Sequence, residues 1–399
     1  MDLLSPPIPN RKEVYRAFLR RFDPAETPDS ALKADLIDAS LSSGRIDRFA
    51  AALLLRPGSQ HALLGGIGSG KSTELRLLSS ALMERDLEML PIFIDISISV
   101  DLNKSKPGSI LVAAALAIES QWPGKPSVET VKTFEKLKKL AHGYSEWFHE
   151  SESHQDGPDD MFQVKFDGLI TPPAEPIEYN VLEISELFAD LKTSLASGGK
   201  ELVMLLDGMD RLLDPNKFWK FVYQDFAAFR KLEISLVTAA PLSLLHNEGR
   251  GILDHFDTFQ LVPTISLDEA GLTLLRGILS RRQAQELIDS ELYDDICRGS
   301  GGVLRDLISI VQTASQNAYI ESQDHITATY VDAAILQLGQ AYKIGLGNTQ
   351  ILKLRKLQQG ADFEPSSSEN LDLLVSRRIL HRKDRYTVHP ALLRALEIR

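Results

Sequence analysis

The sequence of 399 residues contains a single cysteine, Cys297, so no disulfide can form within the chain. A lone thiol is typical of proteins from a reducing compartment. No run of 18 or more apolar residues is present, and no membrane span is predicted. The first residues lack a basic region followed by an apolar core, which argues against a secretory signal peptide. We therefore expect a cytoplasmic protein without membrane association.

Excess positive charge is also lacking, since the formal net charge is −11. This balance argues against a generally basic nucleic-acid binder. The charge is unevenly distributed, however. Residues 343–399 hold 11 Lys and Arg against 6 Asp and Glu, a net charge of +5, and the remaining 33 basic and 49 acidic residues give −16. A locally basic C-terminal segment therefore follows an acidic body, either as a binding surface or as a solvated face.

Apolar runs alternate with helical patterns through the middle of the chain. The run at 202–206 has no polar alternation, which is typical of a strand covered on both faces. Strands that alternate with helices indicate a parallel α/β sheet. The predicted strands cover 61–64, 90–96, 202–206, 234–238 and 258–262, and the predicted helices cover 71–84, 109–119, 181–196 and 217–231.

The flanking regions have a different pattern. Helical spacing at 11–22 and 31–42 predicts an N-terminal helical segment. Prolines and an acidic run between the second and third strands mark an insertion at about 122–178, with one helix at about 127–141. After the fifth strand, Ser266-Leu267-Asp268-Glu269 is typical of a capping box that opens an all-α region.

The last segment is predicted to form helices and a β-hairpin. The hairpin would pair Ile379-Leu380-His381 with Tyr386-Thr387-Val388 across a charged turn, like the wing of a winged helix. Four domains are therefore predicted: an N-terminal helical segment (1–55), a nucleotide-binding core with its insertion (56–265), a helical lid (266–342) and a winged-helix-like domain (343–399).

The most specific motif lies between a predicted strand and a predicted helix. Gly65, Gly70, Lys71 and Ser72 match the phosphate-binding pattern G-x-x-x-x-G-K-[ST]. In such a loop backbone N–H groups surround a β-phosphate, the lysine neutralises β and γ oxygens, and the hydroxyl ligates Mg²⁺. The predicted nucleotide-binding residues are Gly65, Gly66, Ile67, Gly68, Ser69, Gly70, Lys71, Ser72 and Thr73, with Ser72 as a magnesium ligand.

A second motif is needed downstream to hold the metal. Asp207 follows the apolar run 202–206, as a Walker B carboxylate does, and is the second predicted magnesium ligand. The next residue is Gly208, where most AAA+ motors carry a glutamate that serves as general base. Asp210 is the following carboxylate, and it would have to orient the attacking water. We therefore expect slow, switch-like turnover.

Three further residues are candidates for contact with a nucleotide. Thr238 ends the predicted fourth strand and could sense the γ-phosphate, or it could satisfy its own turn. Arg305 follows a double glycine near the start of a lid helix, and its planar fork suits two phosphate oxygens. Arg250 precedes the fifth strand and could act on a neighbouring subunit, although a solvated arginine explains it as well.

These motifs together resemble AAA+ and STAND-type ATPases. The branch that includes origin-recognition-type proteins is the most similar, since its members carry a winged helix after the lid. Ser43-Gly44-Arg45 is similar to the box that those families place near the adenine, which adds Arg45 to the nucleotide-binding residues. The resemblance covers roughly 43–395 and implies an α/β P-loop sheet in AAA+-like order, an all-α lid, a winged-helix domain, and ATP and Mg²⁺ as cofactors.

The resemblance implies an ATP-binding, slowly hydrolysing switch that regulates a partner protein or an assembly. An effector or regulatory protein acting in trans is expected, a homo-oligomer is compatible with this class, and a role in bacterial defence would suit it. The alternative is an initiator or loader that binds DNA through the basic C-terminal segment. Its phosphate contacts would be Arg377, Arg378, Arg382, Lys383 and Arg385. A third interpretation is a P-loop scaffold that binds nucleotide without hydrolysis.

Overall fold

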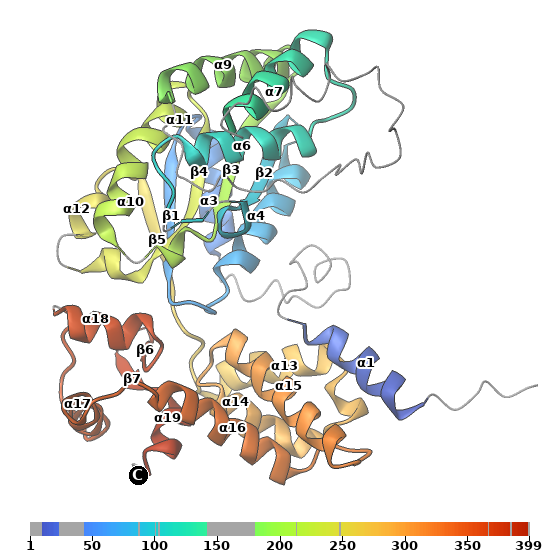
Figure 1. Ribbon diagram of the computed structural model, residues 1–399, viewed down its shortest axis with the longest axis vertical. Helices are drawn as coiled ribbons and strands as arrows, with labels where there is room; N and C mark the ends of the chain where they lie inside the picture. Colours follow the sequence, from blue (N-terminus) through green and yellow to red (C-terminus); the bar gives the residue numbers. More distant parts are fainter. Residues whose placement is uncertain are drawn as a thin grey trace, which may run out of the picture. The chain divides into compact units, whose positions relative to one another are not determined.

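The computed structural model describes residues 10–23, 44–86, 88–99, 101–102, 104–141, 180–212, 214–246, 249–365, 367–383 and 385–397. It divides into two compact units (Figure 1). The sheet unit comprises Gly44–Leu63 and Leu77–Gln260, and the helical unit comprises Met1–Ser43, Leu64–Arg76 and Leu261–Arg399. The predicted helix at 31–42 and the part of the insertion after residue 141 lie outside the described residues.

A five-stranded sheet forms in the order β2-β3-β4-β1-β5. Strands β2 and β3 pair in parallel, as do β3 and β4. The central strands β1, β3 and β4 are buried almost throughout, as expected from their apolar sequences. Strand β5 lies at an edge of the sheet and is partly exposed. The strands are β1 (Gln60–Gly65), β2 (Met89–Asp95), β3 (Glu201–Asp207), β4 (Ser235–Pro241) and β5 (Thr258–Val262). The predicted parallel α/β fold is thus confirmed.

Helices α6 (Ser109–Ser120), α7 (Val128–Ala141) and α9 (Val181–Ser197) pack together, with α6 against β2 and α9 against β3 (Figure 1). Helix α7 is the one helix predicted in the insertion. Other helices of the described residues that follow strands are α4 (Lys71–Arg85), α5 (Ile96–Ser99), the 3-10 turns η2 (Met209–Arg211) and η4 (Leu242–Leu245), and α12 (Arg250–Leu253).

One predicted helix, 217–231, is interrupted. It consists of α10 (Pro215–Phe221), a π-helical turn η3 (Val222–Phe226) and α11 (Ala227–Lys231). A π-turn inserts an extra residue into a helix and redirects its side chains. Here it contains the fully buried Asp225, whose carboxylate accepts N–H bonds from Gly108, Ile110 and Leu111 at the start of α6.

The helical unit has a core of its own. Its main helices are α13 (Glu269–Arg281), α14 (Tyr293–Gly299), α15 (Leu304–Ile320) and α16 (Ala328–Lys343). The capping box predicted at Ser266 is wrong in one respect, because Asp268 is the N-cap of α13 and accepts the N–H of Gly271 at 2.9 Å.

The N-terminal helix α1 (Arg11–Arg21) contributes Tyr15, Phe18 and Phe22 to the core of the helical unit. Helix α3 (Arg45–Leu55) belongs to the sheet unit instead. Helix α1 packs against α15 in the helical unit, and the boundaries predicted for an N-terminal domain over 1–55 remain a prediction. Among the described residues, no helix is both long enough and apolar enough to cross a membrane.

The C-terminal part contains α17 (Asn348–Gln358), α18 (Ser368–Val375), the hairpin β6 (Ile379–His381) and β7 (Tyr386–Val388), and α19 (Pro390–Ala395). The hairpin is antiparallel, with Ile379 opposite Val388 and His381 opposite Tyr386, in the register that the sequence predicts. We call residues 376–397, which hold this hairpin and α19, the C-terminal module.

Candidate nucleotide-binding site

The phosphate loop joins β1 to α4, as its motif predicts. Lys71 is buried at the first position of α4, and its Nζ donates to Gly65 O at 2.8 Å and Gly66 O at 2.9 Å. The hydroxyl oxygen of Ser69 is buried and has no hydrogen-bond partner among the described residues. The loop thus offers a lysine ammonium, an unsatisfied hydroxyl and a helix N-terminus, a donor set that fits a phosphate chain.

Close contacts explain two of the loop's glycines. A Cβ at Gly65 would lie 2.7 Å from Val262 O, so no side chain fits there. Gly68 has φ +81°, and its Cβ would lie 2.9 Å from Val303 Cγ1 and 3.0 Å from Arg305 Cβ. The loop's conformation therefore depends on small residues, as a cradle for phosphates requires.

The start of α15 contacts this loop directly. Leu304 N donates to Gly68 O at 3.1 Å, and the Cβ of Arg305 lies against Gly68. Through these contacts the phosphate loop is part of the helical unit, which includes residues 64–76. Arg305 itself is exposed at the beginning of α15, next to the loop that would bind the phosphates. Its role as a phosphate contact remains a prediction.

Strand β3, the predicted Walker B strand, ends at Asp207. Asp207 is the last residue of β3, is 6% exposed, and accepts the N–H of Gly208 at 2.8 Å. Asp210 follows in the short turn η2 and is half-buried. The roles of Asp207 in metal binding and of Asp210 in orienting water remain predictions.

The sequence analysis expected Thr238 to end its strand, and this is wrong. Strand β4 continues to Pro241, because Ala239 and Ala240 are small and apolar and keep the buried pattern. Thr238 pairs with Leu206, one residue before Asp207, and is fully buried. Its Oγ1 lies 3.4 Å from Ala239 O, so this hydroxyl has a local acceptor.

The structure also shows where the candidate nucleotide contacts Arg45 and Arg250 lie, and their roles remain predictions. Arg45 is the first residue of α3, after Gly44 in the left-handed conformation. Arg250 begins α12, is exposed, and lies over the ring of Phe259 at 5.2 Å from its centroid.

The structure corrects part of the predicted DNA-binding surface. Arg382 is buried, and it donates to Ile265 O at 2.7 Å and Gly301 O at 2.9 Å, so its assignment as a DNA phosphate contact is wrong. Arg378 donates to Tyr342 O at 2.9 Å and to Ile344 O at 2.6 Å. From the sequence, a basic residue in a hairpin turn could contact DNA or form hydrogen bonds within the fold. Only the three-dimensional structure shows which of these side chains point inward.

A buried cluster that the sequence did not reveal surrounds Asp306. Its carboxylate accepts from Tyr342 Oη at 2.6 Å, Arg377 Nη1 at 2.8 Å and His389 Nε2 at 3.2 Å. Burial acts to raise the pKa of Asp306, but the hydrogen bond from His389 and the charge of Arg377 hold it below its ordinary value. His389 Nδ1 accepts the N–H of Ala391, so the ring proton is on Nε2. The cluster joins α15, beside Arg305, to the C-terminal module.

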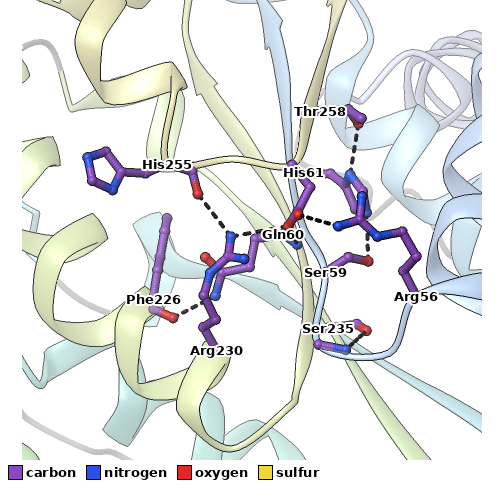
Figure 2. Close-up of polar contacts among 11 residues, drawn as sticks. Arg56, Ser59, Gln60, His61, Phe226, Arg230, Ser235, His255 and Thr258 are labelled. Carbon is purple, nitrogen blue, oxygen red and sulfur yellow. Dashed lines mark hydrogen bonds and ion pairs between the residues drawn. The ribbon is translucent and has the colours of Figure 1, made fainter.

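A second polar cluster lies at the amino end of β1, the end away from the phosphate loop (Figure 2). Asp257 accepts from Gln60 N at 2.8 Å and from the guanidinium groups of Arg56 and Arg230. His61 bonds Thr258 Oγ1 at 2.8 Å and Ser59 Oγ at 2.9 Å, and burial lowers its pKa to about 4. These contacts fix the start of β1 to the strands beside it.

Comparisons with known proteins concern the fold. No protein-family model matches the chain, and no curated protein matches its sequence. The ORC2 protein of Aeropyrum pernix, in its ADPNP and ADP complexes, is similar with 12% identity, a TM-score of 0.49, and coverage of 95% of this chain and 96% of that chain. Cdc6p from Pyrobaculum aerophilum has 14% identity, a TM-score of 0.46, and coverage of 95% and 98%.

The Aeropyrum pernix ORC1 protein in complex with DNA is also similar, with 15% identity, a TM-score of 0.42, and coverage of 91% of this chain and 84% of that chain. At such identities neither ligands nor residue roles carry over to this chain. Its own fold, a parallel α/β sheet with a phosphate loop after β1 and a helical C-terminal unit, is that of a P-loop protein.

Proposed function

We propose that the protein is an ATP-binding switch that hydrolyses ATP slowly and regulates a partner protein or an assembly. The observation that carries the proposal is the loop at 65–73, with its crowded glycines, its buried lysine and the unpartnered hydroxyl of Ser69. Main-chain amides and Lys71 would bind the phosphates of ATP, and Ser72 and Asp207 would hold Mg²⁺. Bound Mg²⁺ would supply charge neutralisation at the phosphates.

The contact between the loop and α15 supports a switch. A ligand that shifts Gly68 must also act on Val303 and Leu304, because they contact it directly. Asp306 then links the same turn of α15 to the C-terminal module. We infer that nucleotide binding changes the conformation of this module, and that a regulatory partner would bind there.

Calorimetry with Mg-ATP tests the proposal. The wild-type chain should bind with a measurable heat, and Lys71→Ala should abolish it because the loop's cation is lost. Lys132→Ala removes an exposed lysine of α7 and is the matched control, which should bind like the wild type. Equal binding by the wild type and Lys71→Ala would contradict the proposal, as would turnover of many ATP molecules per second without a partner.

A DNA-binding initiator is the second candidate, favoured by the exposed Lys383 and Arg385 at the hairpin turn. Helix α18, directly before the hairpin, carries Glu369 and Asp372 and no basic residue, which makes it a poor partner for a DNA groove. A salt series separates the two candidates. Affinity for DNA that falls steeply with salt, and is lost in the Lys383→Ala, Arg385→Ala double variant, would favour the initiator.

A further inference from the structure

The carboxyl ends of β2 and β3 bring two aspartates together. In the parallel register of these strands Asp95 pairs with Asp207, the predicted Walker B carboxylate. Asp95 is half-buried, and its Oδ1 accepts from Ser97 N at 3.0 Å and Ser97 Oγ at 2.6 Å. The sequence could have indicated Asp95 as a site residue, because it follows an apolar run just as Asp207 does.

Gly208 shows where the carboxylate of Asp95 lies. Gly208 has φ +84°, and a Cβ built on it would lie 2.8 Å from Asp95 Oδ1 and 2.9 Å from Ser97 N. A side chain at position 208 is therefore excluded twice, by the backbone conformation and by its neighbours. The carboxylate of Asp95 occupies the space into which that side chain would extend.

We propose that Asp95 is a catalytic residue for ATP hydrolysis that takes the role predicted above for Asp210, supplying from β2 the carboxylate that position 208 lacks. The inference rests on the proposed ATPase function. The water that Asp95 orients forms a bond to the γ-phosphorus while the bond from that phosphorus to the bridging oxygen breaks. ADP leaves with the electron pair, and a proton of the water passes through the carboxylate to solvent.

The hydrogen bonds of Asp95 do not themselves require a negative charge. An asparagine at position 95 keeps an oxygen that can accept from Ser97 N and Ser97 Oγ, so Asp95→Asn preserves the turn and removes only the charge and the proton acceptor. A purely structural role therefore predicts normal behaviour of Asp95→Asn. A catalytic role predicts loss of hydrolysis with the fold intact.

The charge also predicts an effect on binding. Two neighbouring carboxylates repel a triphosphate unless Mg²⁺ is present to neutralise them. Removing one of them should tighten nucleotide binding without metal and weaken the benefit that Mg²⁺ gives. This effect involves no chemical step and can be measured with a non-hydrolysable ATP analogue.

The experiment compares the wild-type chain with Asp95→Asn and Glu201→Gln. Glu201 is the matched control, an exposed carboxylate at the other end of β3. Asp95→Asn should lower the single-turnover hydrolysis rate by roughly 100-fold or more. By calorimetry with the analogue, the ratio of its Kd in EDTA to its Kd with Mg²⁺ should fall roughly threefold to tenfold. Glu201→Gln should hydrolyse within about threefold of the wild type.

Each contrary result has a distinct meaning. Hydrolysis by Asp95→Asn at the wild-type rate with an unchanged magnesium ratio would overturn the role of Asp95 and leave the ATPase proposal standing. An equal rate loss in Glu201→Gln would show that the effect is not specific to position 95, which also overturns it. If the wild type shows no Lys71-dependent ATP binding, both proposals are wrong.

Discussion

At the scale of single residues, His61 is a buried group whose protonation the fold opposes. Its side chain is 1% exposed, and its two ring nitrogens are satisfied by Ser59 and Thr258 in the cluster of Figure 2. Burial lowers its pKa to about 4, although the charge of Asp257 acts in the opposite direction. The folded chain therefore keeps this ring neutral under conditions in which an unfolded chain would protonate it.

This shift predicts acid sensitivity. Because the folded pKa of His61 lies below its unfolded value of about 6.5, stability from the neutral ring is present above that value and is lost as pH falls toward 4. Relative to His61→Gln, the wild type should lose up to about 3 kcal/mol of unfolding free energy between pH 7 and pH 4. Urea unfolding at several pH values measures this, and parallel curves for the two proteins would refute it.

The site residues differ in how far the sequence could place them. The spacing of Gly65, Gly70 and Lys71 defines a local motif, and the loop conformation follows from short-range contacts. The pairing of Asp95 with Asp207 depends on the register of two strands separated by about a hundred residues, which no local pattern encodes. The burial of Arg382 likewise depends on distant carbonyl groups.

At the scale of elements, the π-turn of 222–226 ties two helices together. Asp225 within it accepts from three N–H groups at the start of α6, where unpaired donors would otherwise be buried. The sequence predicted a continuous helix over 217–231, because helical spacing alone cannot reveal one extra residue in a turn. Burial raises the pKa of Asp225 to about 7, against the effect of these hydrogen bonds.

The raised pKa of Asp225 determines how the stability of the folded chain depends on pH. Between about pH 4 and 7 the folded chain holds the proton of Asp225 more tightly than the unfolded chain, so unfolding free energy contributed by this group falls as pH rises. In Asp225→Asn this contribution is absent. The stability of the wild type relative to Asp225→Asn should therefore decrease from pH 5 to pH 7.5 in urea unfolding, and an increase would contradict the assignment.

The hairpin β6–β7 is attached to the helical unit through Arg382. Truncating it to alanine would leave Ile265 O and Gly301 O without their donor, at a cost of about 1–3 kcal/mol for each buried group. Arg385→Ala, at the exposed hairpin turn, should change stability by no more than about 0.5 kcal/mol. Thermal unfolding of the two variants measures the difference, and equal midpoints would show that Arg382 is not structural.

At the scale of the whole chain, the helical unit is assembled from distant segments. Helix α1 is held there by its apolar face and by Arg11, which donates to Tyr319 O at 2.6 Å and Gln323 O at 2.9 Å beside the end of α15. The alternation of strands and helices predicted the sheet, and helical periodicity predicted α1. Periodicity could not predict which core α1 joins, because any apolar surface could receive the same face.

The burial of α1 predicts that the helical unit is unstable without it. Phe18→Ala should cost about 3–5 kcal/mol, because the ring is fully buried in that core. Arg16→Ala, on the exposed face of the same helix, is the matched control and should change little. Thermal unfolding and limited proteolysis report the loss, and indistinguishable behaviour of the two variants would argue that α1 is not part of the core.

The cluster around Asp306 limits how the protein can be shortened. Its carboxylate is 2% exposed and takes two of its partners, Arg377 and His389, from the C-terminal module. Removing the module would take away the charge of Arg377 and the hydrogen bond of His389, and would leave Tyr342 as the remaining partner of this carboxylate. Expression of a fragment that ends at α16 should therefore yield a poorly soluble helical unit, whereas the same fragment with Asp306→Asn should recover solubility.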